Sequence, residues 1–443
     1  MNWRSFFKKL FLLLVFFYIE IAISFSDKIS FEKDFLLNEN KAISTRLSNN
    51  LSRYVAMQEF DTYIEEFVKK WDITGASVAL VKNGRLIYAK GFGYADRENK
   101  IKVQPKHIFR LASVSKLITA TTIMKMVEQN KISLSDTVFG KSGILNDSLF
   151  LDIRDKRVKD ITIQTLLDHS AGFTKRYGDP MFKYHSISRK LKKELPLAQD
   201  DIIHYALKYR RLGFVPGKRK SYSNLGYVIL GQVIEKVSQT NYEDYVVANI
   251  LNPIGIYDMH IGKSEKKDKF DNEVVYNGLK GENNVFSSFS SKEIVPKYYG
   301  GNSIEALGSA GGWVASPAEL MKFIVAIDGN DYPKDLLNEK SIRKMAYPGK
   351  GNGPYGWTGT NANGDWWRTG TLSGTSALVK RQSDGISWVF LINSTAKTGA
   401  RFPVQINKTM IRAISTIKKW PDYNLFDYYE PKSLDSKYFA VKD

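Results

Sequence analysis

The stretch FRLASVSKLITATTIMKM, from Phe109 to Met126, organises the rest of the chain because it joins a candidate nucleophile to a long apolar run. Ser113 and Lys116 are three residues apart, and in a helix this spacing puts both side chains on one face. A serine hydroxyl is a weak nucleophile, and a lysine that burial keeps neutral can take its proton. The same four residues also fit a helix-capping serine followed by a solvated lysine, so other motifs must decide.

The helix predicted after Ser113 is apolar on nearly every side, with Leu117, Ile118, Ile123, Met124, Met126 and Val127. A helix without a polar face is predicted to lie at the centre of the protein. A serine at its N-terminus lies beside unpaired backbone N–H groups and the positive end of the helix dipole. These groups stabilise negative charge, which favours the catalytic interpretation.

Two β-hairpins are predicted at opposite ends of the chain. Asn83-Gly84 and Asp384-Gly385 are two-residue turn signals between apolar runs. The strands are expected at 76–82, 85–92, 377–382 and 386–393. A helix with an apolar stripe from Met57 to Val68 precedes the first hairpin, and a closing helix of about 403–417 follows the second. Between 130 and 307 the sequence is helical, loop-rich and charged.

A second motif, Tyr222-Ser223-Asn224, precedes another apolar helix. The plain structural interpretation is a turn in which Asn224 caps the helix. In the functional interpretation, Lys116 lowers the pKa of the Tyr222 phenol, which then moves protons to and from Ser113 and the leaving group. The Asn224 amide then binds the substrate carbonyl.

A third motif, Arg368-Thr369-Gly370, is followed by Thr371 and leads into the second hairpin. On a strand beside the nucleophile, Arg368 would offer a cation for a substrate carboxylate. The backbone N–H of Thr371 would form half of an oxyanion hole. An ordinary edge strand is the alternative interpretation.

In this order, Ser113-x-x-Lys116, Tyr222-Ser223-Asn224 and Arg368-Thr369-Gly370 resemble the three motifs of the serine β-lactamase and penicillin-binding protein superfamily. The sequence around them is similar to the class C-like branch, which includes class C β-lactamases, D-alanyl-D-alanine carboxypeptidases, D-aminopeptidases and related esterases. The resemblance covers about Met57 to Ile417. It implies an α/β (α+β) fold, a mostly antiparallel sheet flanked by helices with an all-helical lobe inserted after the Ser113 helix, and an active site between the lobes.

The resemblance implies a role for each catalytic residue. Ser113 is expected to be the nucleophile that becomes acylated, Lys116 its proton partner and Tyr222 the base. The backbone N–H groups of Ser113 and Thr371 match the oxyanion hole.

The remaining matches are substrate-binding positions. Asn224 matches the amide that binds the substrate, and Arg368, Thr369 and Gly370 form the third motif. Arg368 departs from the family pattern, because lysine or histidine usually stands there. A guanidinium keeps the charge but not the shape of an ammonium group, so anion recognition is expected to persist while β-lactam turnover is less assured.

The N-terminus predicts export. Arg4, Lys8 and Lys9 precede an unbroken apolar run from Leu10 to Ile19, as in a secretory signal. An uncleaved membrane anchor is the alternative, but a spanning helix needs about 20 apolar residues and Glu20 interrupts this run. The expected divisions are a signal peptide at 1–25, a linker at 26–52, a serine hydrolase domain at 53–417 and a C-terminal tail at 418–443.

The composition limits the expected partners and cofactors. The chain has no cysteine and five dispersed histidines, so neither a disulfide nor a metal or other cofactor is expected. Its net charge is +19, which raises the question of an anionic partner. His169, just before Gly172, is taken as a structural residue. The basic runs 189–193 and 263–269 lack interleaved aromatic residues, which argues against nucleic acid.

The sequence thus predicts an exported serine hydrolase, periplasmic or extracellular, that cleaves amide or ester bonds through a Ser113 acyl-enzyme. Its substrate is expected to be a small molecule or derived from peptidoglycan, and the N-terminal segment could associate with the membrane surface. β-Lactamase, D-alanyl-D-alanine carboxypeptidase and esterase activities all remain open. The alternative is a catalytically silent protein of the same fold that binds peptidoglycan fragments or β-lactams.

Overall fold

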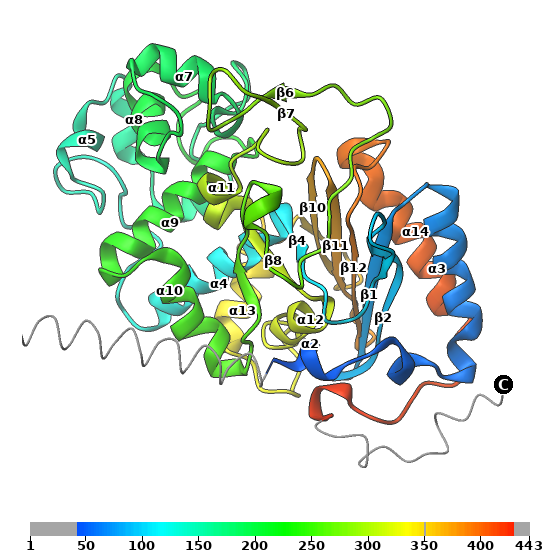
Figure 1. Cartoon of the computed structure of the whole chain (residues 1–443). Coiled ribbons are helices and arrows are strands. Elements are labelled where there is room, and N and C mark those ends of the chain that lie inside the picture. The colour runs from blue at the N-terminus through cyan, green and yellow to red at the C-terminus, as the bar shows by residue number, and fades with distance from the viewer. Residues whose placement is uncertain (1–41, 350, 429–443) are drawn as a thin grey trace, which may run out of the picture.

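The two predicted hairpins lie side by side in one antiparallel sheet, although about 280 residues of sequence separate them (Figure 1). The computed structural model describes residues 42–349 and 351–428. The sheet has the order β3-β2-β1-β12-β11-β10-β9, and β1 pairs with β12 from Ala76 opposite Ile392 to Lys82 opposite Ile386. Its strands are β1 (Gly75–Lys82), β2 (Arg85–Asp96), β3 (Ile101–Lys102), β9 (Gly359–Thr360), β10 (Trp366–Leu372), β11 (Thr375–Arg381) and β12 (Ile386–Ile392).

The first hairpin forms because its turn residues accept left-handed backbone angles. Asn83 has φ 49° and Gly84 has φ 76°, and a tight turn with two such residues matches the twist of the flanking strands. Both predicted hairpins are confirmed within two residues, except that β2 continues to Asp96.

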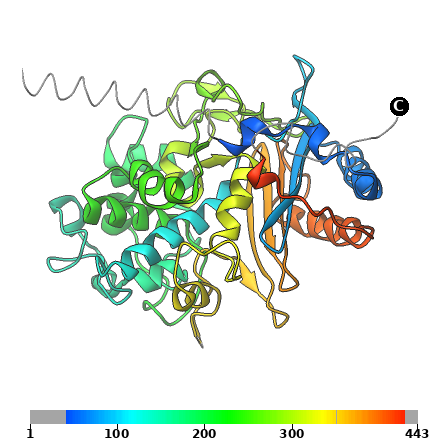
Figure 2. The same cartoon turned by 90° about the horizontal axis from the view of Figure 1, so that it is seen from below.

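Two helices cover the outer face of the sheet, α3 (Gln58–Lys70) and α14 (Phe402–Ser415), as both views show (Figures 1 and 2). They correspond to the helices expected at 57–68 and 403–417. Phe67 of α3 packs 5.6 Å from the rings of both Phe390 in β12 and Phe402 in α14. These aromatic contacts join three segments from both ends of the chain.

The opposite face carries the central helix and the helical lobe. α4 (Ser115–Glu128) is buried over most of its length, as its apolar sequence predicts, and α12 (Pro317–Val325) packs on β1 and β12 in the middle of the sheet. The lobe and its surroundings contain α5 (Ser148–Leu151), α6 (Ile163–Leu167), α7 (Tyr184–Leu191), α8 (Gln199–Tyr209), α9 (Asn224–Ser238), α10 (Tyr242–Val246), α11 (Ile304–Gly311) and α13 (Glu339–Ala346).

The inserted segment is mostly helical but not entirely so. It includes β5 (Met259–Ile261) and a two-stranded hairpin of β6 (Val285–Phe286) and β7 (Ile294–Val295). β5 joins β4 (Phe109–Arg110) and β8 (Trp313–Ala315) in a small sheet of order β4-β8-β5. Strands of two or three residues are too short to leave an alternating apolar pattern, so the expectation of an all-helical lobe was too simple.

The described part of the expected linker, 42–52, is folded instead of extended. It contains α2 (Ile43–Arg46), and both Ile43 and Leu47 are buried. The backbone N–H of Ile43 donates to the buried Glu319 carboxylate at 3.0 Å, a long-range contact that leaves no periodic signal. The chain after 417 is likewise packed up to Phe426, which is 9% exposed. The predicted signal peptide lies outside the described residues.

Residues 304–311 form α11, kinked at Gly308, where φ is 31°. Ser316 caps the next helix, α12, because its Oγ accepts from the N–H of Glu319. Within 42–349 and 351–428, none of the helices combines the length and the apolar character needed to cross a membrane.

Replacing Phe67 by alanine is expected to lower the free energy of unfolding by about 3–5 kcal/mol, because the cavity would separate α3, α14 and β12. Chemical denaturation of the purified protein measures this change. Ile411→Ala on α14 is the control, since Ile411 is 49% exposed and its loss should cost less than about 0.5 kcal/mol. Equal losses in both variants would contradict the packing described for Phe67.

Candidate active site

The candidate nucleophile lies where a strained turn enters the central helix. Ser113 belongs to the 3₁₀ turn η3 (Ala112–Val114), which runs directly into α4. Ala112 has φ 47°, a left-handed conformation that costs free energy in a residue with a side chain. The surrounding structure therefore holds the backbone at this position instead of letting it relax.

Strand β10 presses against this turn at a glycine. A methyl group on Gly370 would collide with the carbonyl oxygen of Leu111 and lie 3.0 Å from the backbone nitrogen of Ser113. The third motif thus needs glycine at this position so that the two backbones can touch. Thr371, the next residue, lines the same cleft as Ser113.

The Ser113 hydroxyl has the tyrosine of the second motif as its nearest polar partner. Its Oγ lies 2.6 Å from Tyr222 Oη, and Lys116 Nζ lies 3.5 Å from the same Oγ. Tyr222 comes from the loop before α9, 109 residues later in the chain. Folding therefore brings the first and second motifs together as predicted.

The Lys116 ammonium group is fully buried, and three oxygens surround it. In addition to Ser113 Oγ, its Nζ donates to Asn224 Oδ1 at 2.8 Å and to the Ala310 carbonyl at 2.5 Å. The Ala310 carbonyl lies near the end of α11. No feature of the sequence marks a main-chain carbonyl as a ligand, so this partner could not be predicted.

Burial and neighbouring charges bring the pKa values of two groups together. Burial lowers the pKa of Lys116 to about 8, although the Tyr222 phenolate opposes the change. For Tyr222, burial raises the pKa, but the positive charges of Lys116 and Arg368 outweigh it and lower the value to about 8. A proton can therefore move between the two groups at little free-energy cost near that pH.

Arg368 lies beside the nucleophile and is only 2% exposed. Its Nε donates to the carbonyl oxygen of Ser113 at 2.6 Å, and its Nη2 donates to Tyr222 Oη at 3.2 Å. The guanidinium thus contacts both the nucleophile's backbone and the candidate base. Its expected contact with a substrate carboxylate stays a prediction, but these two contacts give it a further effect on Tyr222.

The Asn224 amide has one orientation because its two ends face opposite charges. Its Oδ1 accepts from the Lys116 ammonium, and its Nδ2 donates to Asp179 Oδ2 at 2.9 Å. An amide has two N–H groups, so one remains for a substrate. The helix cap itself is Ser223, whose side chain accepts from the N–H of Gly226, so the expectation that Asn224 caps α9 was wrong. Ser223 holds the extended backbone angles of a cap, whereas Asn224 is already helical.

Asp179 is a site residue that the sequence analysis missed. Asp179-Pro180 begins a short 3₁₀ helix, and the Asp179 side chain also accepts from the N–H of Met181. An aspartate before a proline does predict a helix start. It does not predict that the second carboxylate oxygen reaches α9.

His169 lies next to the site but not against the Ser113 hydroxyl. The centre of its ring lies 4.7 Å from that of Tyr222 and 5.1 Å from that of Tyr227, with the rings tilted, and its Nδ1 accepts from the N–H of Ser223. Burial and the charges of Arg368 and Lys116 hold its pKa well below the usual range. A neutral histidine that packs on Tyr222 agrees with the structural role expected for it.

These groups line a cleft of about 400 Å³ between the sheet and the helical lobe. Ser113, Tyr222, Asn224, Arg368, Thr369 and Thr371 are all in its wall. A larger hollow of about 640 Å³ lies near β2 and β3, but none of these residues lines it. The cleft at Ser113 is therefore the one that combines a nucleophile with bases and donors.

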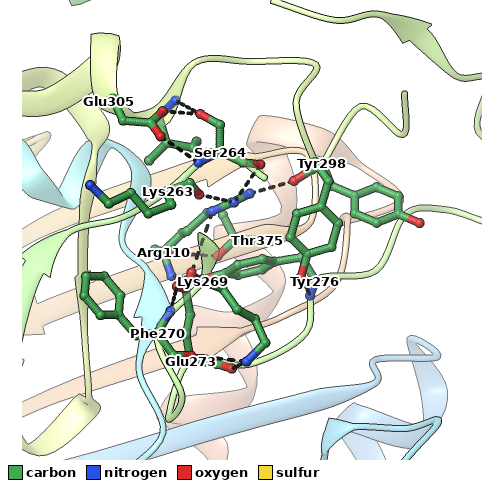
Figure 3. Close-up of polar contacts among 12 residues, drawn as sticks. Arg110, Lys263, Ser264, Lys269, Phe270, Glu273, Tyr276, Tyr298, Glu305 and Thr375 are labelled. Carbon is green, nitrogen blue, oxygen red and sulfur yellow. Dashed lines mark hydrogen bonds and ion pairs between the residues drawn. The ribbon is translucent and has the colours of Figure 1, made fainter. Parts of the chain in front are cut away.

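A buried arginine three residues before the nucleophile supports the turn, and sequence analysis missed it as well (Figure 3). Arg110 donates to the carbonyl oxygens of Lys263 and Tyr298, each at 2.6 Å. Its own carbonyl accepts from Thr375 Oγ1 at 2.8 Å, and Glu273 lies 3.9 Å from its Nε. Arg110 therefore ties β11 and the segment 263–298 to the strand that enters η3.

Comparison with known proteins agrees with the family resemblance drawn from the sequence. The family model described as Beta-lactamase matches residues 60–405. Protein flp of Staphylococcus aureus (strain NCTC 8325 / PS 47) is 29% identical over 226 residues, which make up 51% of this chain and 41% of that protein. The chain therefore matches about two fifths of the length of that relative. The putative penicillin-binding protein PbpX of Bacillus subtilis (strain 168) is 25% identical over 366 residues, 82% of each chain.

Solved structures share the fold. D-amino acid amidase from Ochrobactrum anthropi SV3, complexed with L-phenylalanine amide, matches with a TM-score of 0.63 and 20% identity, covering 82% of this chain and 98% of that one. The octameric penicillin-binding protein homologue from Pyrococcus abyssi matches with a TM-score of 0.60 and 23% identity over 82% and 78% of the two chains. The resemblance to this superfamily and the fold class it implied are confirmed.

The phenol of Tyr222 is expected to ionise near pH 8, about two units below an ordinary tyrosine, because two cations face it. The near-ultraviolet absorbance of phenolate, recorded as pH rises, should show one early step in the unaltered protein. Tyr222→Phe should remove this step alone. An unchanged titration curve in that variant would contradict the proximity of Tyr222 to Lys116 and Arg368.

Proposed function

The chain belongs to the beta-lactamase family, and from this premise we propose that it is a serine hydrolase that cleaves an amide bond through an acyl-enzyme on Ser113. The observation that carries the proposal is the 2.6 Å contact between Ser113 Oγ and Tyr222 Oη beside the buried Lys116. A nucleophile, a base and a group that keeps the base ionised are thus in direct contact.

In the proposed reaction, Ser113 Oγ attacks the substrate carbonyl carbon while its proton passes to the Tyr222 phenolate. The backbone N–H groups of Ser113 and Thr371 stabilise the resulting oxyanion. As the carbon–nitrogen bond breaks, Tyr222 returns the proton to the leaving amine, and an ester on Ser113 remains. A water molecule then attacks this ester, gives one proton to Tyr222 and releases the acid, and Ser113 regains its proton.

The substrate we propose is an amide or peptide of a D-amino acid. Support comes from the fold shared with D-amino acid amidase and from the sequence similarity to a putative penicillin-binding protein. Asn224 keeps one N–H for the substrate carbonyl, and Thr369 lines the cleft beside Arg368. β-Lactams and small esters need the same acyl transfer, so they are the competing substrates to assay in parallel.

We also propose that the protein is exported and works outside the cytoplasm. The basic residues before the apolar run 10–19 support this proposal. Fractionation of cells that produce the full chain, followed by N-terminal sequencing of the mature protein, tests both export and cleavage.

Exposure of the purified protein to a fluorophosphonate is expected to add a single phosphonyl group, because an activated serine attacks phosphorus as it attacks a carbonyl carbon. Intact mass spectrometry measures the adduct. Ser113→Ala should give no adduct while the protein stays folded. A folded protein without any adduct would instead favour a catalytically silent binding protein. Binding of peptidoglycan fragments and of β-lactams would then be measured.

The acylation rate is expected to rise with pH through about 8, because the base gains its active form as the Tyr222 and Lys116 pair loses a proton. Arg368 lowers the pKa of both groups, so Arg368→Ala should move this profile to higher pH by about one unit. Acylation at neutral pH should then fall roughly tenfold for neutral substrates, and further for substrates whose carboxylate Arg368 is expected to contact.

Arg368→Lys is the matched control, since it keeps the positive charge. Its profile should stay closer to that of the unaltered protein. A loss confined to substrates with a free carboxylate, without any shift of the profile, would show that Arg368 acts on the substrate and not on Tyr222.

A further inference from the structure

The cleft at Ser113 continues into a larger groove. Phe182 and Leu372 line the cleft and also line a second hollow of about 630 Å³. Arg189 then joins this hollow to a third one of about 460 Å³. The walls of both are residues 182–195, around α7, and 285–302, around the β6–β7 hairpin, which Figure 1 shows beside α7. We call these two joined hollows the basic groove.

The basic groove carries an excess of positive charge. Its lining includes Lys183, Arg189, Lys192, Lys193, Lys292 and Lys297, all of them exposed. Among the described residues that line it, Glu194 is the only one with a carboxylate. Lys193 pairs with Asp201 at 2.6 Å, but the other five cations have no carboxylate within the groove lining other than Glu194. Such a surface favours an occupant with several negative groups.

Apolar side chains line the basic groove together with these cations. Phe182 is 36% exposed and Phe286 is 58% exposed, and both line the basic groove beside Leu372. An acidic peptide can place apolar side chains on these surfaces and carboxylates beside the lysines. A polyphosphate chain has no apolar groups, so it would leave the phenylalanines in water.

One wall of the basic groove is anchored next to the nucleophile. Arg110 holds the carbonyl oxygens of Lys263 and Tyr298, which flank the segment that carries the β6–β7 hairpin (Figure 3). Ser264 near the start of that segment also bonds Glu305 of α11 just after its end. A wall fixed at both ends loses little conformational entropy when a substrate binds.

We propose that the basic groove binds the carboxylate-bearing part of an extended peptide substrate while the scissile amide lies at Ser113. The inference rests on the proposed function, because continuity with the Ser113 cleft is what makes the occupant a substrate. The groove then selects substrates by charge at a distance from the reacting bond. Compact amides that lack the acidic part would bind only through the cleft.

The test compares two peptides that end in D-alanyl-D-alanine, one with two glutamates upstream and one with glutamines in their place. Calorimetric titration of the Ser113→Ala protein measures binding without turnover. The acidic peptide is expected to bind at least about tenfold more tightly at low ionic strength, and added salt should reduce the difference. Equal affinities for the two peptides, or no binding of either, would overturn the proposal.

A triple variant locates the binding. Lys183→Gln, Arg189→Gln and Lys297→Gln together should remove most of the preference for the acidic peptide. The matched control, Lys408→Gln, Arg412→Gln and Lys419→Gln, removes the same charge from exposed positions in or just after α14 and should keep the preference. Equal losses in both variants would show general attraction to a basic protein and overturn the proposal. Polyphosphate that binds in place of the acidic peptide would overturn it as well.

Fluorophosphonate labelling of the unaltered protein separates this inference from the proposed function. Labelling without any preference for the acidic peptide would leave the hydrolase proposal standing and refute the role of the basic groove. Preferential binding of the acidic peptide without labelling would support the groove and refute catalysis at Ser113.

Discussion

The buried ammonium group of Lys116 constrains the whole site. A charge without water needs several oxygens around it, and here they come from η3, α9 and α11. These elements are far apart in sequence and belong to different parts of the fold. Because each must supply its oxygen at hydrogen-bond distance, the ammonium group fixes how the helical lobe sits against the turn that carries Ser113.

The charges around Lys116 explain why the site stabilises the phenolate form of Tyr222. Two cations, Lys116 and Arg368, face Tyr222. The carboxylate of Asp179 does not bond Lys116 directly, because the Asn224 amide stands between the two groups. With a carboxylate in direct contact, Lys116 would stay protonated and the need for a phenolate would fall. The Asn224 amide thus separates the negative charge from the ammonium group, which leaves Tyr222 as the nearest group that can balance it.

The sequence predicted best those features that depend on neighbouring residues. The hairpins at Asn83-Gly84 and Asp384-Gly385, the buried helix after Ser113 and the three motifs all follow local rules of turn chemistry, periodicity and spacing. Asp179, Arg110 and the Ala310 carbonyl could not be predicted, since each acts through a partner over 40 residues away. The same reason explains the error at 42–52, where long-range contacts fold a segment without periodicity.

Arg110, three residues before Ser113, connects the reacting centre to the basic groove that we propose for substrate binding. Arg110 donates to the carbonyl oxygens of Lys263 and Tyr298, and it also lies against the side chains of Glu273 and Tyr276. Side chains of the segment 263–298 that do not touch Arg110 can therefore change without breaking the anchor, whereas the backbone path must stay fixed. Lining residues such as Lys297 and Phe286 are thus free to set substrate preference while the geometry at Ser113 is retained.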